Sequence, residues 1–196
     1  SDGGEAGMHP SNIHDNAYAV GSIDFTGDMP VILGPDGPSL GGFVCPATLI
    51  TADLWKLGQL RAGDKVRFVP VSITTAVDLE YDQSRELDTL QKISVDIPSQ
   101  PVPESAIHAS LSIDAHPVGV TYRPAGDHYL LIEYGEEVLD IALRFRGHRL
   151  MQHLQSQQIT GIRELTPGIR SLQVHYDSQV LPLDRLLEIL QQVETE

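Results

Sequence analysis

The densest group of polar side chains in this sequence lies between residues 9 and 16. It combines two imidazoles, one carboxylate and two carboxamides, from His9, Asn12, His14, Asp15 and Asn16. A carboxylate accepts hydrogen bonds from N–H groups, whereas amide and imidazole N–H groups donate to a carbonyl oxygen. The segment could therefore recognise a small polar molecule that carries both kinds of group. The alternative is a turn in which the Asn and Asp side chains bond to their own backbone.

Other chemistries find less support. A metal site from His9, His14 and Asp15 is disfavoured, because neither a helical His pair nor a Cys accompanies them. The loop at residues 34–42, Gly-Pro-Asp-Gly-Pro-Ser-Leu-Gly-Gly, lacks the Gly-Lys-Ser/Thr ending of a phosphate-binding loop. Within it, Gly41 and Gly42 would either let backbone approach a substrate or simply allow a tight turn. Cys45 lies in an apolar run and is expected to be a buried, inert thiol.

Composition removes several classes of function. The chain has 196 residues with 27 acidic and 13 basic side chains, a formal charge of −14, which argues against binding nucleic acid. No apolar run approaches the roughly 18–20 residues of a membrane span, so no membrane partner is expected. A single cysteine excludes an internal disulfide and favours a reducing, cytoplasmic setting. The length suits one or two domains.

Residues 1–72 are expected to form a β-rich, barrel-like unit that positions the polar segment. Short apolar runs separated by Gly, Pro and Asp predict strands over 17–25, 29–33, 42–50 and 65–71. Thr26-Gly27-Asp28 has the composition of a hairpin turn, and a brief helix fits residues 51–60, with Trp55 in the core. The polar segment itself is expected to be a loop before the first strand.

Two further zones follow. Residues 73–117 are acidic and contain three closely spaced prolines, which is typical of a solvated linker, although a helix fits residues 76–93. Residues 118–196 predict a compact α+β domain, with a hairpin over 118–122 and 129–134, a helix over 138–154, strands over 162–165 and 171–176, and a closing leucine-rich helix. This ββαββα order indicates an antiparallel sheet with two helices packed on it.

The same residues also resemble a known family. The stretches 18–33, 41–44, 52–54 and 58–68 resemble the C-terminal half of the KipA family, and 125–135 and 165–177 resemble the N-terminal half of KipI. KipA-like before KipI-like in one chain is the order of the carboxyltransferase domain in urea carboxylase and urea amidolyase. The Asn-x-His-Asp-Asn form of residues 12–16 resembles the urea-carboxylase version of these motifs.

The resemblance implies a cyclophilin-like barrel portion, followed by a small α+β sandwich. It also implies biotin, with ATP and bicarbonate used by another domain, and transfer of the carboxylate from carboxybiotin to urea, giving allophanate. On this hypothesis Asn12 and His14 donate to the urea carbonyl and Asp15 accepts from its N–H groups. Asn16 fixes the loop or contacts biotin, and Gly41 and Gly42 allow close backbone approach.

Alternatives remain open at this point. They are a guanidine-preferring carboxylase of the same family, a KipA- or KipI-type regulatory or binding protein, and a 5-oxoprolinase component. The expected partners are urea or guanidine and the biotin carboxylase and biotin carboxyl carrier domains. Because the chain begins at Ser1 and its first methionine is Met8, we expect a piece of a longer protein that is inactive alone. The open edges of a truncated barrel would permit a homo-oligomer.

Overall fold

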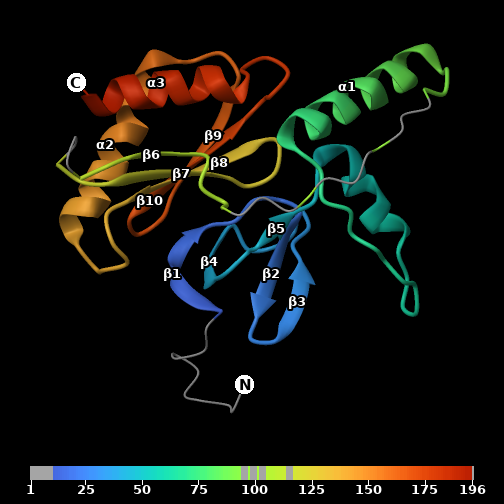
Figure 1. The fold of residues 1–196 in the computed structure, drawn as a ribbon, viewed down its shortest axis with the longest axis horizontal. Coiled ribbons are helices and arrows are strands. Elements are labelled where there is room, and N and C mark those ends of the chain that lie inside the picture. The colour runs from blue at the N-terminus through green and yellow to red at the C-terminus, as the bar shows by residue number, and fades with distance from the viewer. Residues whose placement is uncertain (1–10, 94–96, 98–100, 102–104, 114–116, 196) are drawn as a thin grey trace.

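The computed structural model describes residues 11–93, 97, 101, 105–113 and 117–195. Two β-rich parts lie side by side, with helix α1 (Ile73–Thr89) projecting beside them (Figure 1). The strands are antiparallel throughout, and three helices accompany them in the second half and the connection, so the expected α+β class is confirmed. None of the helices in the described residues combines the length and the apolar character needed to cross a membrane.

The first part contains two small sheets. Strand β1 (Asn12–Ala17) pairs with β4 (Leu40–Phe43), while β2 (Ser22–Thr26) lies between β3 (Met29–Ile32) and β5 (Ala47–Thr48). The expected hairpin turn is confirmed: Thr26 pairs with Met29, and Gly27 adopts a φ of 66° that favours glycine. The described strands of this part form no closed barrel.

Two predictions at the start of this part are wrong. The polar segment is not a loop, because residues 12–16 belong to strand β1. The single strand expected over 17–25 is broken at Gly21, which has a φ of 91°. A Cβ atom at Gly21 would also lie 3.1 Å from the backbone carbonyl oxygen of Leu49, so the close approach of that backbone favours glycine there as well. The chain therefore reverses between β1 and β2.

The end of the first part differs from expectation as well. The brief helix is present as the 3₁₀ helix η2 (Thr51–Gln59), but Trp55 is 58% exposed and not in the core. Residues 65–71 form no strand, and Val66 and Phe68 are about half exposed. Alternating apolar residues produce a strand only where a neighbouring strand completes the hydrogen bonds, and no described strand does so here.

The connecting region is more structured than a linker. Helix α1 (Ile73–Thr89) starts at the N-cap Ser72, whose hydroxyl accepts a hydrogen bond from the backbone N–H of Thr75, and ends at Leu90 in the left-handed conformation. Strand β6 (Ala109–Leu111), which lies within the expected linker, pairs with β7 (Val120–Pro124) at the edge of the second sheet. The domain boundaries at 72/73 and 117/118 stay a prediction.

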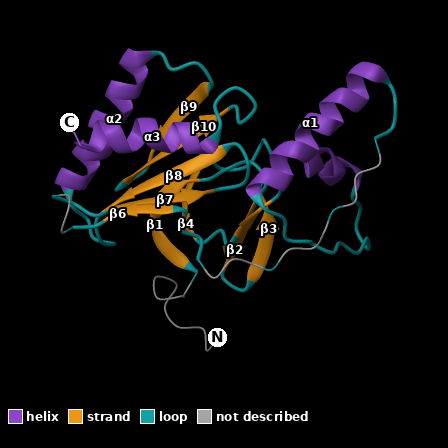
Figure 2. Cartoon of the chain, turned by 45° about the horizontal axis from the view of Figure 1, so that its top comes forward, coloured by secondary structure: helices purple, strands orange, loops and turns teal. Residues whose placement is uncertain are grey.

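The second part is a five-stranded sheet in the order β6-β7-β8-β10-β9, formed with β7 (Val120–Pro124), β8 (Tyr129–Tyr134), β9 (Ile162–Pro167) and β10 (Ser171–Tyr176). Helices α2 (Ile141–Gln157) and α3 (Leu183–Thr195) cover one face (Figure 2). The core between these layers includes the fully buried Leu130, Ile132 and Tyr134, which alternate along β8. Helix α2 begins later than predicted, after its N-cap Asp140, so Leu139 is 79% exposed and does not join the apolar stripe.

The opposite face of the second sheet is polar but also buried. Ser171 and Gln173 alternate with the core residues of β10, and Gln173 is only 4% exposed. Its side-chain amide donates to the backbone carbonyl of Ala17, 3.1 Å away. The first part therefore packs on this face through strand β1, which brings the residues of the polar segment to the junction of the two parts.

Candidate functional site

An irregularity in β1 determines where Asp15 lies. Asn12 pairs with Phe43 and Asn16 pairs with Gly41, so three residues of β1 stand opposite the single residue Gly42. A bulge of this kind bends its strand and redirects side chains, and Asp15 is exposed within it. The polar segment therefore presents its carboxylate from the rim of a short sheet.

Neighbouring atoms occupy the space that a side chain would need at each of the two glycines of β4. A Cβ atom at Gly41 would lie 2.5 Å from the ring of Tyr18, and one at Gly42 would lie 2.8 Å from the carbonyl oxygen of Ile13. The Tyr18 hydroxyl accepts a hydrogen bond of 2.8 Å from the Phe43 N–H, and burial raises the pKa of this phenol to about 12. Gly41 and Gly42 thus allow β4 to pack closely against β1 and Tyr18.

Asp15 is held against the second part of the chain. Its carbonyl oxygen accepts a hydrogen bond of 3.2 Å from the N–H of Ile169, in the loop between β9 and β10. A Cβ atom at Gly168 would lie 3.1 Å from that same oxygen, so the loop and β1 touch without a side chain between them. The carbonyl of Gly168 in turn accepts a hydrogen bond of 2.8 Å from the Arg144 guanidinium on α2.

An open groove of about 470 Å³ lies beside these contacts. Its walls combine apolar and charged side chains, contributed by Asp15, Leu40, Leu139, Asp140, Ile141, Arg144 and the loop residues 167–169. Asp140 uses a carboxylate oxygen to cap α2, accepting from the Ala142 N–H at 2.8 Å. The groove therefore offers a hydrogen-bond acceptor at Asp15, a cation at Arg144 and apolar surface between them, which suits a small ligand with N–H and anionic groups.

The predicted site residues are brought together only in part. Asn12, Asp15 and Asn16 share strand β1, and Asn16 stands opposite Gly41. Of these, Asp15 lines the groove. The side chain of His14 and the whole of His9 lie outside the described residues. The predicted roles of Asn12, His14, Asp15, Asn16, Gly41 and Gly42 stay proposals.

Sequence reasoning missed Arg144, Asp140 and Gly168, which complete the groove. They lie far from Asp15 in the sequence, and only the fold joins them. A signal was available for Gly168, because it belongs to the Thr-Pro-Gly stretch within the KipI-like motif of residues 165–177. Arg144 carried none beyond its place on a helix. Cys45 is half-buried rather than buried, and desolvation raises its pKa to about 12, which keeps it a protonated thiol.

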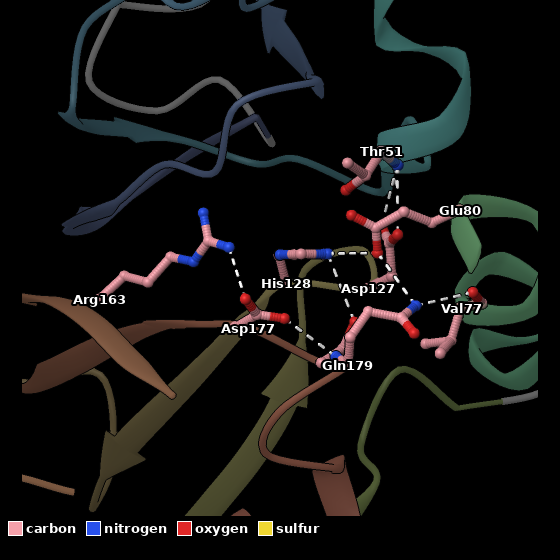
Figure 3. Close-up of polar contacts among 9 residues, drawn as sticks. Thr51, Val77, Glu80, Asp127, His128, Arg163, Asp177 and Gln179 are labelled. Atoms are coloured by element: carbon pink, nitrogen blue, oxygen red, sulfur yellow. Dashed lines mark hydrogen bonds and ion pairs between the residues drawn. The ribbon is translucent and has the colours of Figure 1, made fainter. Parts of the chain in front are cut away.

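A second polar cluster, which sequence reasoning also missed, lies where η2, α1 and the β7–β8 turn meet. We call Glu80, Asp127 and His128 the junction trio. In Figure 3 their side chains point toward one another. The Asp127 carboxylate accepts hydrogen bonds of 3.0 and 3.3 Å from the backbone N–H of Thr51, and the Nε2 atom of His128 lies 2.7 Å from a carboxylate oxygen of Glu80.

Comparisons with known proteins define the class. Residues 2–70 match the family model "Carboxyltransferase domain, subdomain A and B", and residues 120–196 match "Carboxyltransferase domain, subdomain C and D". Because these matches together span more than half of the chain, it belongs to the carboxyltransferase-domain family. The resemblance seen in the sequence motifs is thereby confirmed.

Within that family the chain corresponds to part of the carboxyltransferase region of urea amidolyase and urea carboxylase. It is 41% identical over its whole length to the urea amidolyase of Lachancea kluyveri, of which it spans 11%. Crystal structures of the K. lactis urea amidolyase and the Kluyveromyces lactis urea carboxylase match 99% of this chain, with TM-scores of 0.89 and 0.87 and identities of 43% and 42%. The chain covers 12% and 18% of those proteins.

Proposed function

We propose that this chain forms one wall of a carboxyltransferase site at which carboxybiotin gives its carboxylate to urea, yielding allophanate. The observation that carries the proposal is the Asp15 groove, at the junction of the segments that match subdomains A/B and C/D. Similarity to urea amidolyase and urea carboxylase over the whole chain supports urea as the acceptor. Biotin would supply the carboxylate and, once decarboxylated, a base for the urea proton.

The donor set of the groove fits such a reaction. Urea is a poor nucleophile, so its nitrogen must be held close to the carboxyl carbon in an orientation suited to attack. The Asp15 carboxylate accepts from urea N–H groups, and Asn12 and His14 donate to the urea carbonyl. The Arg144 guanidinium, held by Gly168, faces the transferred carboxylate and stabilises its negative charge. Leu40, Leu139 and Ile141 give the apolar surface that a biotin ring needs.

The whole protein's other parts belong to the same proposal. A biotin carboxylase domain would use ATP and bicarbonate to load a biotin carboxyl carrier domain, and the carrier would deliver carboxybiotin to this groove. The setting would be the cytoplasm. A KipA- or KipI-type regulatory protein would instead bind a ligand in the groove without catalysing a reaction.

Guanidine is the competing acceptor. A guanidinium ion carries a positive charge and is favoured where carboxylates gather. Two carboxylates, Asp15 and Asp140, line the groove, although Asp140 also caps α2. Turnover by the complete natural protein, measured with urea and with guanidine as the acceptor, decides between them through the ratio of the two kcat/KM values.

The test replaces Asp15 by Asn in the complete natural protein. A hydrogen bond to a charged group contributes about 1.5–3 kcal/mol, so we expect urea-dependent turnover to fall about 10–150-fold. ATP-dependent carboxylation of biotin should persist, because it occurs elsewhere. Asp36→Asn, which changes an exposed carboxylate in the 34–40 loop, is the matched control. Equal urea turnover in the Asp15 and Asp36 variants would contradict the proposed site.

A further inference from the structure

The junction trio has a mixed donor set at coordination spacing. One nitrogen of His128 and one carboxylate oxygen each from Glu80 and Asp127 all lie within 4.8 Å of one another. Asp127 is 2% exposed and His128 is 6% exposed, so both are taken almost wholly out of water. The three residues come from α1 and from the turn between β7 and β8, and the backbone of η2 reaches Asp127 (Figure 3).

The negative charge of this trio is not balanced by a Lys or Arg side chain. Within the described residues, neither Glu80 nor Asp127 forms an ion pair with a Lys or Arg. Arg163, the nearby cation, is instead paired with Asp177 at 2.6 Å. With a neutral imidazole the trio therefore carries two negative charges, one on the buried Asp127 and one on the partly buried Glu80, which is costly unless a cation compensates them.

A cavity opens at the same residues. It has a volume of about 220 Å³, and the trio shares its walls with Thr48, Thr51, Tyr129, Arg163 and His175. A single water molecule occupies about 30 Å³ of liquid, so there is room for a metal ion with one or more waters. The hydroxyl of Ser178, 3.3 Å from the Nε2 atom of His128, is a further polar neighbour.

We infer that Glu80, Asp127 and His128 form a binding site for a divalent cation of the Zn²⁺ type, separate from the Asp15 groove. Imidazole with carboxylates suits zinc and neighbouring transition metals, whereas Mg²⁺ prefers an all-oxygen, water-rich shell. In the metal-free state the Nε2–H group of the imidazole donates to Glu80; when the ion binds at Nε2, that proton moves to Nδ1 and the ring stays a neutral ligand. The bound ion joins α1 to the β7–β8 turn.

The experiment uses the untagged chain, titrated with ZnCl₂ in an isothermal calorimeter. We expect one Zn²⁺ per chain and no binding of Mg²⁺ at the same concentrations. Loss of a residue that only supports a ligand costs about 10–100-fold in metal affinity, so losing a ligand itself should cost about 100-fold or more. Glu80→Gln, Asp127→Asn and His128→Gln should each show this loss.

Matched controls remove the same chemical groups elsewhere. Glu164→Gln deletes an exposed carboxylate, and His153→Gln deletes an imidazole on α2; both should bind Zn²⁺ as the unchanged chain does. Circular dichroism checks that every variant is folded. Because a trio variant could unfold, Co²⁺ on the unchanged chain provides a second readout, as its visible absorption should report nitrogen and oxygen ligands and disappear when Zn²⁺ is added.

Three results would overturn the inference. They are the absence of Zn²⁺ binding by the unchanged chain, equal affinity in the His128 and His153 variants, and a Co²⁺ spectrum that persists in folded His128→Gln. In each case the trio would be a hydrogen-bonded joint in which an imidazolium ion supplies the positive charge.

Discussion

Gly168 lies at a close contact between the two parts of the chain, and Gly168→Ala tests whether that contact positions Asp15. The added methyl group would lie 3.1 Å from both the Asp15 carbonyl oxygen and the Asn16 Cα, and still closer to the Ser171 hydroxyl. The Ser171 side chain can rotate away, but the backbone of β1 can yield only by moving. Overpacking of this kind typically costs about 1–3 kcal/mol, and we expect that loss in the free energy of unfolding.

The assay is guanidinium chloride denaturation followed by circular dichroism, together with urea-dependent turnover by the complete natural protein. Gly34→Ala is the matched control, because a Cβ there would meet no atom within 4 Å. Its expected change is within about 0.5 kcal/mol, as for other surface substitutions. In the double variant Gly168→Ala/Ser171→Ala, only the part of the loss caused by the hydroxyl should return. If Gly168→Ala is as stable and as active as Gly34→Ala, the contact does not position Asp15.

Two further predictions concern the second sheet. Tyr176 is fully buried, and its hydroxyl has no hydrogen-bond partner in the described part of the chain. Tyr176→Phe should therefore leave the free energy of unfolding unchanged or raise it by up to about 1 kcal/mol, as measured by thermal unfolding. A clear loss of stability would show that the hydroxyl does have a partner. Burial lowers the pKa of His175, which stacks on Tyr129 at 4.4 Å. The pKa of His175 is lower in the folded than in the unfolded chain, so unfolding takes up a proton as the pH falls. The stabilisation that the neutral ring gives the folded state is therefore complete above about pH 6.5 and is lost below it. His175→Gln should therefore flatten the stability profile between pH 7 and pH 5, and an unchanged slope would contradict this assignment.

The elements of the second part could be predicted because their signals are local. Leu130, Ile132 and Tyr134 alternate along β8, and the apolar stripe of α2 through Leu143 and Leu150 keeps the spacing of a helix. Which of these residues are buried follows from the regular spacing of apolar side chains within a single strand or helix. The sequence therefore predicts four of the five strands and both helices, but not the edge strand β6, which lies in the expected linker.

The first part was harder to predict because pairing overrides local preference there. Asn and Asp disfavour strands, so the composition of residues 12–16 predicts a loop, yet pairing with Gly41 and Phe43 of β4 makes them a strand. The reverse holds for Val66 and Phe68, whose alternation predicts a strand that finds no partner in the described chain. Neither outcome can be deduced without knowing which strands meet.

The groove shows the same limit at the level of the site. Asp15 was singled out from its chemistry alone, but Arg144 and Gly168 become relevant only when α2 and the β9–β10 loop come to lie beside β1. A salt bridge or a metal-ligand pair leaves complementary residues in the sequence. A guanidinium that donates to a backbone carbonyl needs no particular side chain on the accepting residue. The contact between Arg144 and the Gly168 carbonyl therefore could not be predicted from the sequence.

Backbone groups of the first part make three of its contacts with the second. Gln173 donates to the carbonyl of Ala17, the N–H of Ile169 donates to the carbonyl of Asp15, and Asp127 accepts from the N–H of Thr51. Each of these hydrogen bonds is made to a backbone group of the first part rather than to a side chain. The contacts therefore constrain the path of β1 and the start of η2 without requiring particular residue types there. The carbonyl of Asp15 thus anchors the strand at the residue that lines the groove. The geometry of the proposed site therefore depends on the second part as much as on the strand that carries its carboxylate.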